Sequence, residues 1–201
     1  LVSLEETVRI GRAHQMPVIL DAAGVTHPLS KMQAYAQTTD LACFGAKYLG
    51  ATHSAGFLCG RKDLVEAASA HGFIAFQTGV RGFGRPMKVD RQEIVGVLTA
   101  IDAWFHMNHE DRLLGYEAKL SSIQRGLHGL PHVDAGVSQT NTYYGVTLKV
   151  KFDADALGLT AEEAKEKLAD GDPSVWVLTE GDDTLLVNAH TLNENEQEIV
   201  A

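Results

Sequence analysis

The stretch that decides the fold is DLACFGAKYLGATHSAG, residues 40–56. Its apolar run from Leu41 to Phe44 predicts a buried strand. The run ends in a turn of small residues that carries one lysine, Lys47, and a second apolar strand is expected over 55–60. An ammonium held between two buried strands loses hydration, which frees the amine to act as a nucleophile. The stretch therefore predicts a nucleophilic lysine in a buried sheet.

A carboxylate stands at the end of another predicted strand. Residues 17–21 form an apolar run that ends in Asp21. A lysine and an aspartate at two strand tips are the groups that pyridoxal phosphate requires, because the lysine forms the Schiff base and the aspartate keeps the pyridine nitrogen protonated. Ligands of open α/β sheets collect at such strand ends. The simpler interpretation is a solvated surface charge for Lys47 and a turn or capping residue for Asp21.

Alternating strands and helices predict an α/β fold with a mostly parallel sheet covered on both faces. A glycine-rich loop over 72–88 is expected to close over a site. Helical periodicity over 90–127 predicts one long helix that links two domains, 1–112 and a small α+β domain over 113–201. The predicted elements are helices at 3–15, 30–37, 61–70, 160–169 and from about 193, and strands at 17–21, 40–44, 55–60, 143–152, 174–178 and 183–188.

Composition narrows the class of protein. The chain has 201 residues and a net charge of −9, which argues against a nucleic-acid partner because phosphate binding requires a basic surface. No apolar run approaches the roughly 20 residues of a membrane span. The two cysteines, Cys43 and Cys59, form no C-x-x-C pair, and their place in predicted buried strands favours a reduced, cytoplasmic protein. The chain opens on Leu1 and is expected to begin inside a fold.

Further polar residues are candidates for binding. Arg85 and Lys88 follow the glycine-rich loop and suit an anionic substrate group, although a solvated basic turn with Asp90 and Glu93 as partners is the alternative. His27 follows Asp21 on a loop and is a candidate for substrate contact. No metal is expected, because the His106–Asp111 segment has no matching third ligand and no His-Glu-x-x-His motif occurs.

Several strings together resemble one family of enzymes. They are Asp21-Ala22-Ala23, Phe44-Gly45-Ala46-Lys47, Gly60-Arg61-Lys62-Asp63-Leu64, Gly84-Arg85-Pro86-Met87-Lys88-Val89 and Val187-Asn188-Ala189-His190-Thr191-Leu192. The chain resembles the selenocysteine-synthase-like branch of fold-type-I pyridoxal phosphate enzymes, and within it the D-glucosaminate-6-phosphate ammonia-lyase type. The resemblance implies part of the cofactor-binding large domain followed by a small C-terminal domain.

The resemblance also implies roles for individual residues. Lys47 would hold pyridoxal 5'-phosphate, Asp21 would meet its ring nitrogen and Ala23 would pack on the ring. The turn Thr52-His53-Ser54 would reach the cofactor phosphate of a neighbouring subunit, so a homodimer or higher homo-oligomer is expected. Hydroxyls and amides in a small-residue turn suit phosphate oxygens, and a capped loop start is the alternative. The branch usually has Pro-Gln where this chain has Thr52-His53.

The expected reaction is β-elimination and deamination of a hydroxylated or phosphorylated, sugar-derived amino acid. No arginine follows Arg125, whereas many aminotransferases of this fold bind the substrate carboxylate with one, so an ordinary aminotransferase is disfavoured. Two alternatives stay open. One is selenium transfer on seryl-tRNA, and the other, from a different class, is a cofactor-free truncated scaffold.

Overall fold

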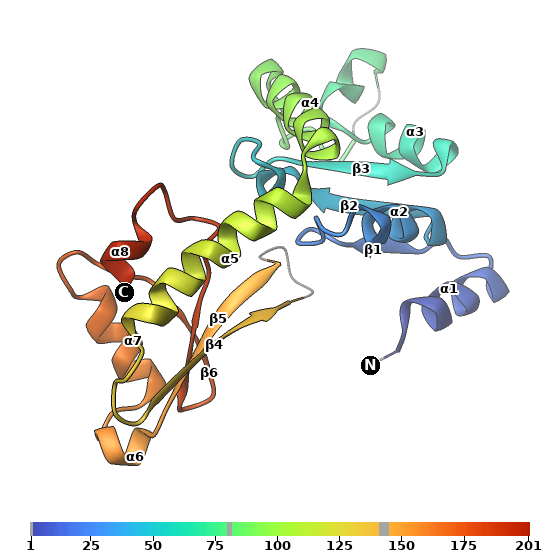
Figure 1. Ribbon diagram of the computed structural model, residues 1–201. Helices are drawn as coiled ribbons and strands as arrows, with labels where there is room; N and C mark the ends of the chain where they lie inside the picture. The colour runs from blue at the N-terminus through green and yellow to red at the C-terminus, as the bar shows by residue number, and fades with distance from the viewer. Residues whose placement is uncertain (1, 80–81, 141–144) are drawn as a thin grey trace. The chain divides into compact units, whose positions relative to one another are not determined.

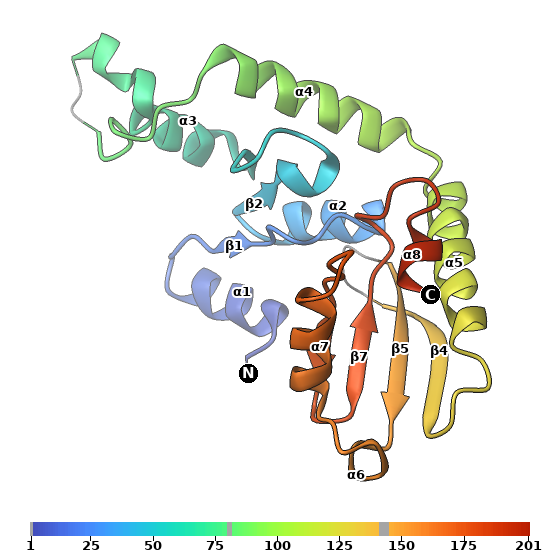
Figure 2. The same cartoon turned by 90° about the vertical axis from the view of Figure 1, so that its left-hand side faces the viewer.

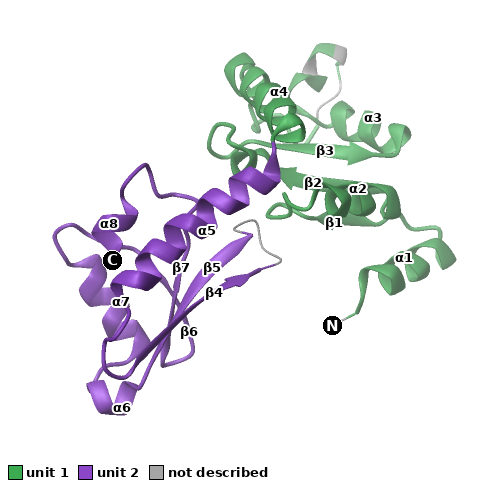
Figure 3. Cartoon of the chain, viewed as in Figure 1, with its two compact units in different colours: residues 1–107 green, residues 108–201 purple. Residues whose placement is uncertain are grey.

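The computed structural model describes residues 2–79, 82–140 and 145–201 (Figure 1). The chain divides into two compact units, one up to Met107 and the other from Asn108, coloured green and purple in Figure 3. The assignment of 1–112 and 113–201 to a large and a small domain stays a prediction. No described helix is long and apolar enough to cross a membrane.

The first unit is built on a three-stranded sheet of order β1-β2-β3. The strands are β1 (Ile19–Asp21), β2 (Leu41–Gly45) and β3 (Gly56–Gly60). β1 and β2 are parallel, with Asp21 opposite Cys43, but β2 and β3 are antiparallel. The expected parallel arrangement therefore holds for β1 and β2 and is wrong for β3. The segment between β2 and β3 is too short for the crossover that a parallel pair requires.

Helices cover this sheet. They are α1 (Leu4–Ala13), α2 (Leu29–Thr38), α3 (Lys62–Ala70) and α4 (Arg91–His106), with short 3-10 helices η1 (Ala46–Leu49) and η2 (Phe73–Thr78). Met32 of α2 packs on Ala42 and Phe44, and the rings of Phe44 and Phe57 stack with centroids 5.4 Å apart. These contacts bury one face of β2.

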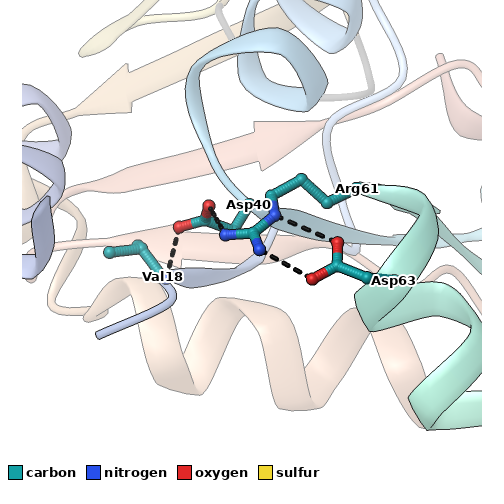
Figure 4. Close-up of polar contacts among 4 residues, drawn as sticks. All are labelled: Val18, Asp40, Arg61 and Asp63. Carbon is teal, nitrogen blue, oxygen red and sulfur yellow. Dashed lines mark hydrogen bonds and ion pairs between the residues drawn. The ribbon is translucent and has the colours of Figure 1, made fainter. Parts of the chain in front are cut away.

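Asp40 ties three strand ends together (Figure 4). Its Oδ2 accepts a hydrogen bond of 2.8 Å from the amide of Val18, just before β1. Its Oδ1 accepts one of 3.0 Å from Arg61, just after β3, and Arg61 also binds Asp63 through two nitrogens. The backbones meet closely here, since a Cβ on Gly60 would lie 2.2 Å from the carbonyl oxygen of Asp40. The amide of Val18, and then Arg61, hold the pKa of Asp40 below its ordinary value.

The long helix predicted over 90–127 is two helices, α4 and α5 (His109–Gly126). The break has a local cause. The side-chain oxygen of Asn108 accepts hydrogen bonds from the amides of Glu110 and Asp111, so Asn108 caps a new helix. The apolar periodicity continues across the break, which is why the pattern alone suggested one helix.

The second unit is a four-stranded antiparallel sheet of order β4-β5-β7-β6. Figure 2 shows β7, β5 and β4 side by side. The strands are β4 (Val133–Gln139), β5 (Val146–Phe152), β6 (Leu178–Glu180) and β7 (Thr184–Val187), and the helices are α6 (Ala154–Leu157), α7 (Ala161–Ala169) and α8 (Gln197–Val200). Leu120 and Ile123 of α5 pack with Leu148 of β5 in its core. The sequence prediction missed β4 and α6, and it placed a strand at 174–178 where only Leu178 is in β6. The strand predicted over 143–152 contains β5, and its first two positions lie outside the described residues.

Replacing Asp40 by alanine should lower the free energy of unfolding by about 1.5–3 kcal/mol, because the variant loses two charge-assisted hydrogen bonds. Urea unfolding at pH 7 measures this loss. Asp102→Asn, a change of a largely exposed carboxylate, is the matched control and should stay within about 0.5 kcal/mol.

The difference between wild type and Asp40→Ala should also depend on pH. The pKa of Asp40 is lowered in the fold, so its stabilisation is fully present above the ordinary value of 3.8 and is lost as the pH falls through the lowered pKa. A difference that stayed constant from pH 7 down to pH 2.5 would contradict this role of the carboxylate.

Candidate functional site

Asp21 and Lys47 lie at the same edge of the sheet. Asp21 ends β1 and Lys47 follows β2, and these two strands are parallel neighbours. The ladder continues past the end of β1, since the amide of Ala22 donates to the carbonyl of Cys43 at 2.9 Å and the amide of Gly45, the last residue of β2, donates to the carbonyl of Ala23 at 3.0 Å. The structure therefore brings the two predicted strand tips together, as the sequence suggested.

Lys47 is exposed and lies on η1. Its Nζ lies 4.9 Å from the centre of the Tyr48 ring. The expectation that burial between two strands desolvates this ammonium is therefore wrong for the described chain. The physical reason is that β2 ends at Gly45 and the chain turns outward into η1 before β3 begins.

Asp21 closes its own turn. Its Oδ1 accepts a hydrogen bond of 3.0 Å from the amide of Ala23, and both residues are exposed. The turn interpretation of Asp21 is thus correct for one oxygen. A carboxylate offers about four lone-pair positions, so this hydrogen bond leaves room for a ligand to bind as well.

The loop from Asp21 to His27 is anchored by α4. Thr26 is only 1% exposed, and its carbonyl accepts a buried hydrogen bond of 2.9 Å from Nε1 of Trp104. His27 is partly buried beside it. Trp104 lies within the helical periodicity over 90–127, and that pattern did not mark it as an anchor of this loop. The single available signal was general, namely that a buried indole N–H needs an acceptor.

The turn that carries Thr52, His53 and Ser54 bends back onto η1. The amide of Ala46 donates to the carbonyl of Ala55 at 3.0 Å. Thr52 and His53 are exposed, and Ser54 has a positive φ of 66°. The methyl group of Thr52 lies beside α4, 3.6 Å from where a Cβ on Gly96 would stand.

Arg85 and Lys88 are both exposed but have different surroundings. The Arg85 guanidinium lies 5.0 Å from the centre of the Phe73 ring. Lys88 lines a hollow of about 440 Å³ together with Ser54. The other lining residues are Ala55, Gly56, Met87, Val89, Glu93, Ile94, Val97 and Leu98. Lys88 therefore shares this hollow with the turn after Lys47.

The glycine-rich loop over 72–88 was expected to close over a site. In its described part, this loop is hydrogen-bonded to the end of α3. The amide of Gly84 donates to the carbonyl of His71 at 2.8 Å. A Cβ on Gly84 would lie 2.4 Å from that oxygen, and a Cβ on Gly82 would lie 2.8 Å from it. The glycines thus permit close backbone packing. Within the ranges that the structure describes, no group of three or more His, Cys, Asp or Glu side chains could hold a metal ion.

The chain has relatives in sequence and fold among known proteins, although no family model matches it. A 5'-C-glycyluridine monooxygenase-decarboxylase from Streptomyces sp is 34% identical over 180 residues, which cover 88% of this chain and 42% of that protein. The D-glucosaminate-6-phosphate ammonia lyase of Salmonella typhimurium is 24% identical over 178 residues, covering 88% and 44%. A solved structure of D-glucosaminate-6-phosphate ammonia-lyase superposes on the whole chain with a TM-score of 0.75 and 21% identity. The chain shares the fold of this ammonia-lyase.

The likeness confirms two predictions: the resemblance to the D-glucosaminate-6-phosphate ammonia-lyase type, and the α/β fold of fold-type-I enzymes. The chain spans 42–44% of the length of the two relatives and 51% of the solved ammonia-lyase chain. The finer placement in the selenocysteine-synthase-like branch stays a prediction.

Trp104→Phe should lower the free energy of unfolding by about 1–3 kcal/mol, because it leaves the buried carbonyl of Thr26 without its donor. Trp176→Phe is the matched control, since Trp176 is 83% exposed and Trp104 only 7%, and these are the two tryptophans of the chain. Urea unfolding compares the three proteins. Equal losses in both variants would show that the Trp104 hydrogen bond does not hold the loop.

Proposed function

We propose that this chain is part of a pyridoxal phosphate-dependent lyase that acts on an amino acid. The observation that carries the proposal is the position of Asp21 and Lys47 at the carboxyl ends of two neighbouring parallel strands. Ligands of α/β sheets bind at that edge. The likeness to the ammonia-lyase in sequence and fold supports the same conclusion.

The residues at this edge fit the cofactor in their chemistry. Lys47 would hold it covalently through Nζ, and the Asp21 carboxylate would keep a proton on its ring nitrogen. Small residues adjoin them, and a Cβ on Gly45 would stand only 3.0 Å from the carbonyl oxygen of Ala23. When bound, pyridoxal phosphate supplies an electron sink for bond cleavage at the substrate α-carbon. Ala23 would pack on the ring, and Thr52, His53 and Ser54 would bind phosphate oxygens.

The residues of the chain would then have separate roles in the reaction. When it is not joined to the cofactor, the exposed Lys47 amine could take a proton from the substrate carbon or return one. The Asp21 carboxylate would stabilise the positive charge on the ring nitrogen. Arg85, Lys88 and His27 are proposed to bind an anionic substrate, with Lys88 supported by its place in the hollow beside Ser54.

The substrate class that we propose is a hydroxylated or phosphorylated, sugar-derived amino acid, which would lose water and ammonia by β-elimination. The name of the Salmonella relative supports it. The Streptomyces relative is the more similar in sequence and favours a second candidate, oxidative decarboxylation of an amino acid joined to a nucleoside. Selenium transfer on seryl-tRNA and a cofactor-free scaffold are alternatives that no finding tests. Binding of pyridoxal phosphate would exclude the scaffold, and turnover of a free amino acid in the absence of tRNA would exclude selenium transfer on seryl-tRNA.

We also propose a cytoplasmic homodimer or higher homo-oligomer with no nucleic-acid or membrane partner. An exposed apolar surface supports self-association. Val95 and Leu98 of α4 are each 62% exposed, and Met87 before the helix is 72% exposed. Apolar surfaces of this kind commonly mark protein interfaces.

Borohydride reduction of the full-length protein with pyridoxal phosphate should attach the cofactor to Lys47, because the imine to an exposed lysine at the ligand-binding edge is reduced to a stable amine. Peptide mapping by mass spectrometry identifies the residue. Lys47→Ala should abolish the label, and Lys62→Ala is the matched control that should keep it. A label on Lys62 or Lys88 in the wild type would refute the assignment of Lys47.

The full-length protein should sediment as a dimer or larger at micromolar concentration. Leu98→Glu should shift the population toward the monomer, because it places a charge on the exposed apolar surface of α4. Leu157→Glu, at a 42% exposed position of the second unit, is the control and should leave the distribution unchanged. A fully active wild-type monomer would exclude the oligomer.

A further inference from the structure

An aromatic ring lies directly against the candidate lysine. The Lys47 Nζ is 4.9 Å from the centroid of the Tyr48 ring, within the range of a cation–π contact. Tyr48 is half-buried on η1, whereas Lys47 is exposed. The ring is therefore the more firmly held member of the pair.

A glycine makes room for this ring. A Cβ on Gly45 would lie 2.9 Å from Cδ2 of Tyr48 and 3.1 Å from Cε2. The same Cβ would lie 3.0 Å from the carbonyl oxygen of Ala23, in the turn that follows Asp21. The Tyr48 ring thus packs at the point where the two strand tips meet, and any residue other than glycine at position 45 would push it away.

We propose that Tyr48 is the positioning residue of Lys47, holding its ammonium against the ring face whenever the amine is not joined to another group. The chemistry of this inference rests on the proposed function, but the contact itself does not. The negative face of the ring attracts the ammonium, and the fixed ring restricts a long side chain that would otherwise move freely in water. Lys47 is thereby kept at the sheet edge, beside the turn of Asp21, during the interval in which it must accept or return a proton.

The inference is tested by the rate at which limiting acetic anhydride acetylates Lys47 in the full-length protein freed of cofactor, read residue by residue by mass spectrometry. Lys62, whose side chain is 89% exposed, serves as the internal reference. Tyr48→Leu removes the ring and should raise the relative rate at Lys47 by about 2–5-fold, which equals about 0.5–1 kcal/mol at 1.4 kcal/mol per tenfold. Tyr48→Phe keeps the ring and should retain the wild-type rate.

The chain offers a matched control. Lys31 Nζ lies 5.7 Å from the ring centroid of Tyr35 on α2, so Tyr35→Leu removes a similar ring from a different lysine. This variant should leave the Lys47 rate unchanged. Urea unfolding confirms that each variant folds, and Tyr48→Met replaces Tyr48→Leu if the latter does not.

Two results would overturn the inference: equal Lys47 rates in wild type and Tyr48→Leu, or a Tyr48→Phe rate as high as that of Tyr48→Leu. Failure of the proposed function is distinguishable. Borohydride reduction would then label a lysine other than Lys47 in the wild type, while the acetylation rates would still report the contact with Tyr48.

Discussion

The carboxylate of Asp40 is the constraint on which the first unit depends. It binds the amide that precedes β1 and the arginine that follows β3, and Asp40 itself directly precedes β2. Three strands are thus joined at one end by a single charged side chain. Since a slip of one residue would turn every side chain of a strand to the opposite face, this junction supports the register that sets Asp21 opposite Cys43.

The two ends of the β1–β2 pair differ in whether their charged side chains are paired with each other. Asp40 and Arg61 form an ion pair at the start of the parallel strands β1 and β2. The other end has Asp21 and Lys47 exposed beside small residues, with the following loop anchored through Thr26 to Trp104. Charges that are paired at one end stabilise the fold, and charges exposed at the other are available to a ligand. The packing of Tyr48 against Gly45 adds a means of holding the lysine there.

The sequence predicted those features that depend on local patterns. Apolar runs located β1, β2 and β3, and their turn residues placed Asp21 and Lys47 at strand tips. The antiparallel course of β3 was missed because strand patterns do not encode direction, although the segment between β2 and β3 is too short for a parallel crossover. The break at Asn108 was missed because apolar periodicity continues through it, and β4 was missed although Val133, Ala135 and Val137 alternate with more exposed residues.

Other features of the site depend on contacts far apart in the chain. The hydrogen bond from Trp104 to Thr26 joins residues on different elements, and no local pattern encodes it. The exposure of Lys47 follows from where η1 leaves the sheet, which a burial argument based on flanking strands could not anticipate. The separation of Arg85 from Lys88 likewise reflects packing, since one lies on the Phe73 ring and the other lines the hollow beside Ser54.

The central claim is that Asp21 and Lys47 serve one cofactor at one sheet edge. The most direct measurement is the ¹⁵N chemical shift of the ring nitrogen of labelled pyridoxal phosphate bound to the full-length protein. The account predicts a protonated ring nitrogen in the wild type and in Asp40→Asn, an unprotonated one in Asp21→Asn, and no covalently held cofactor in Lys47→Ala. An identical ring-nitrogen shift in the wild type and in Asp21→Asn would contradict it.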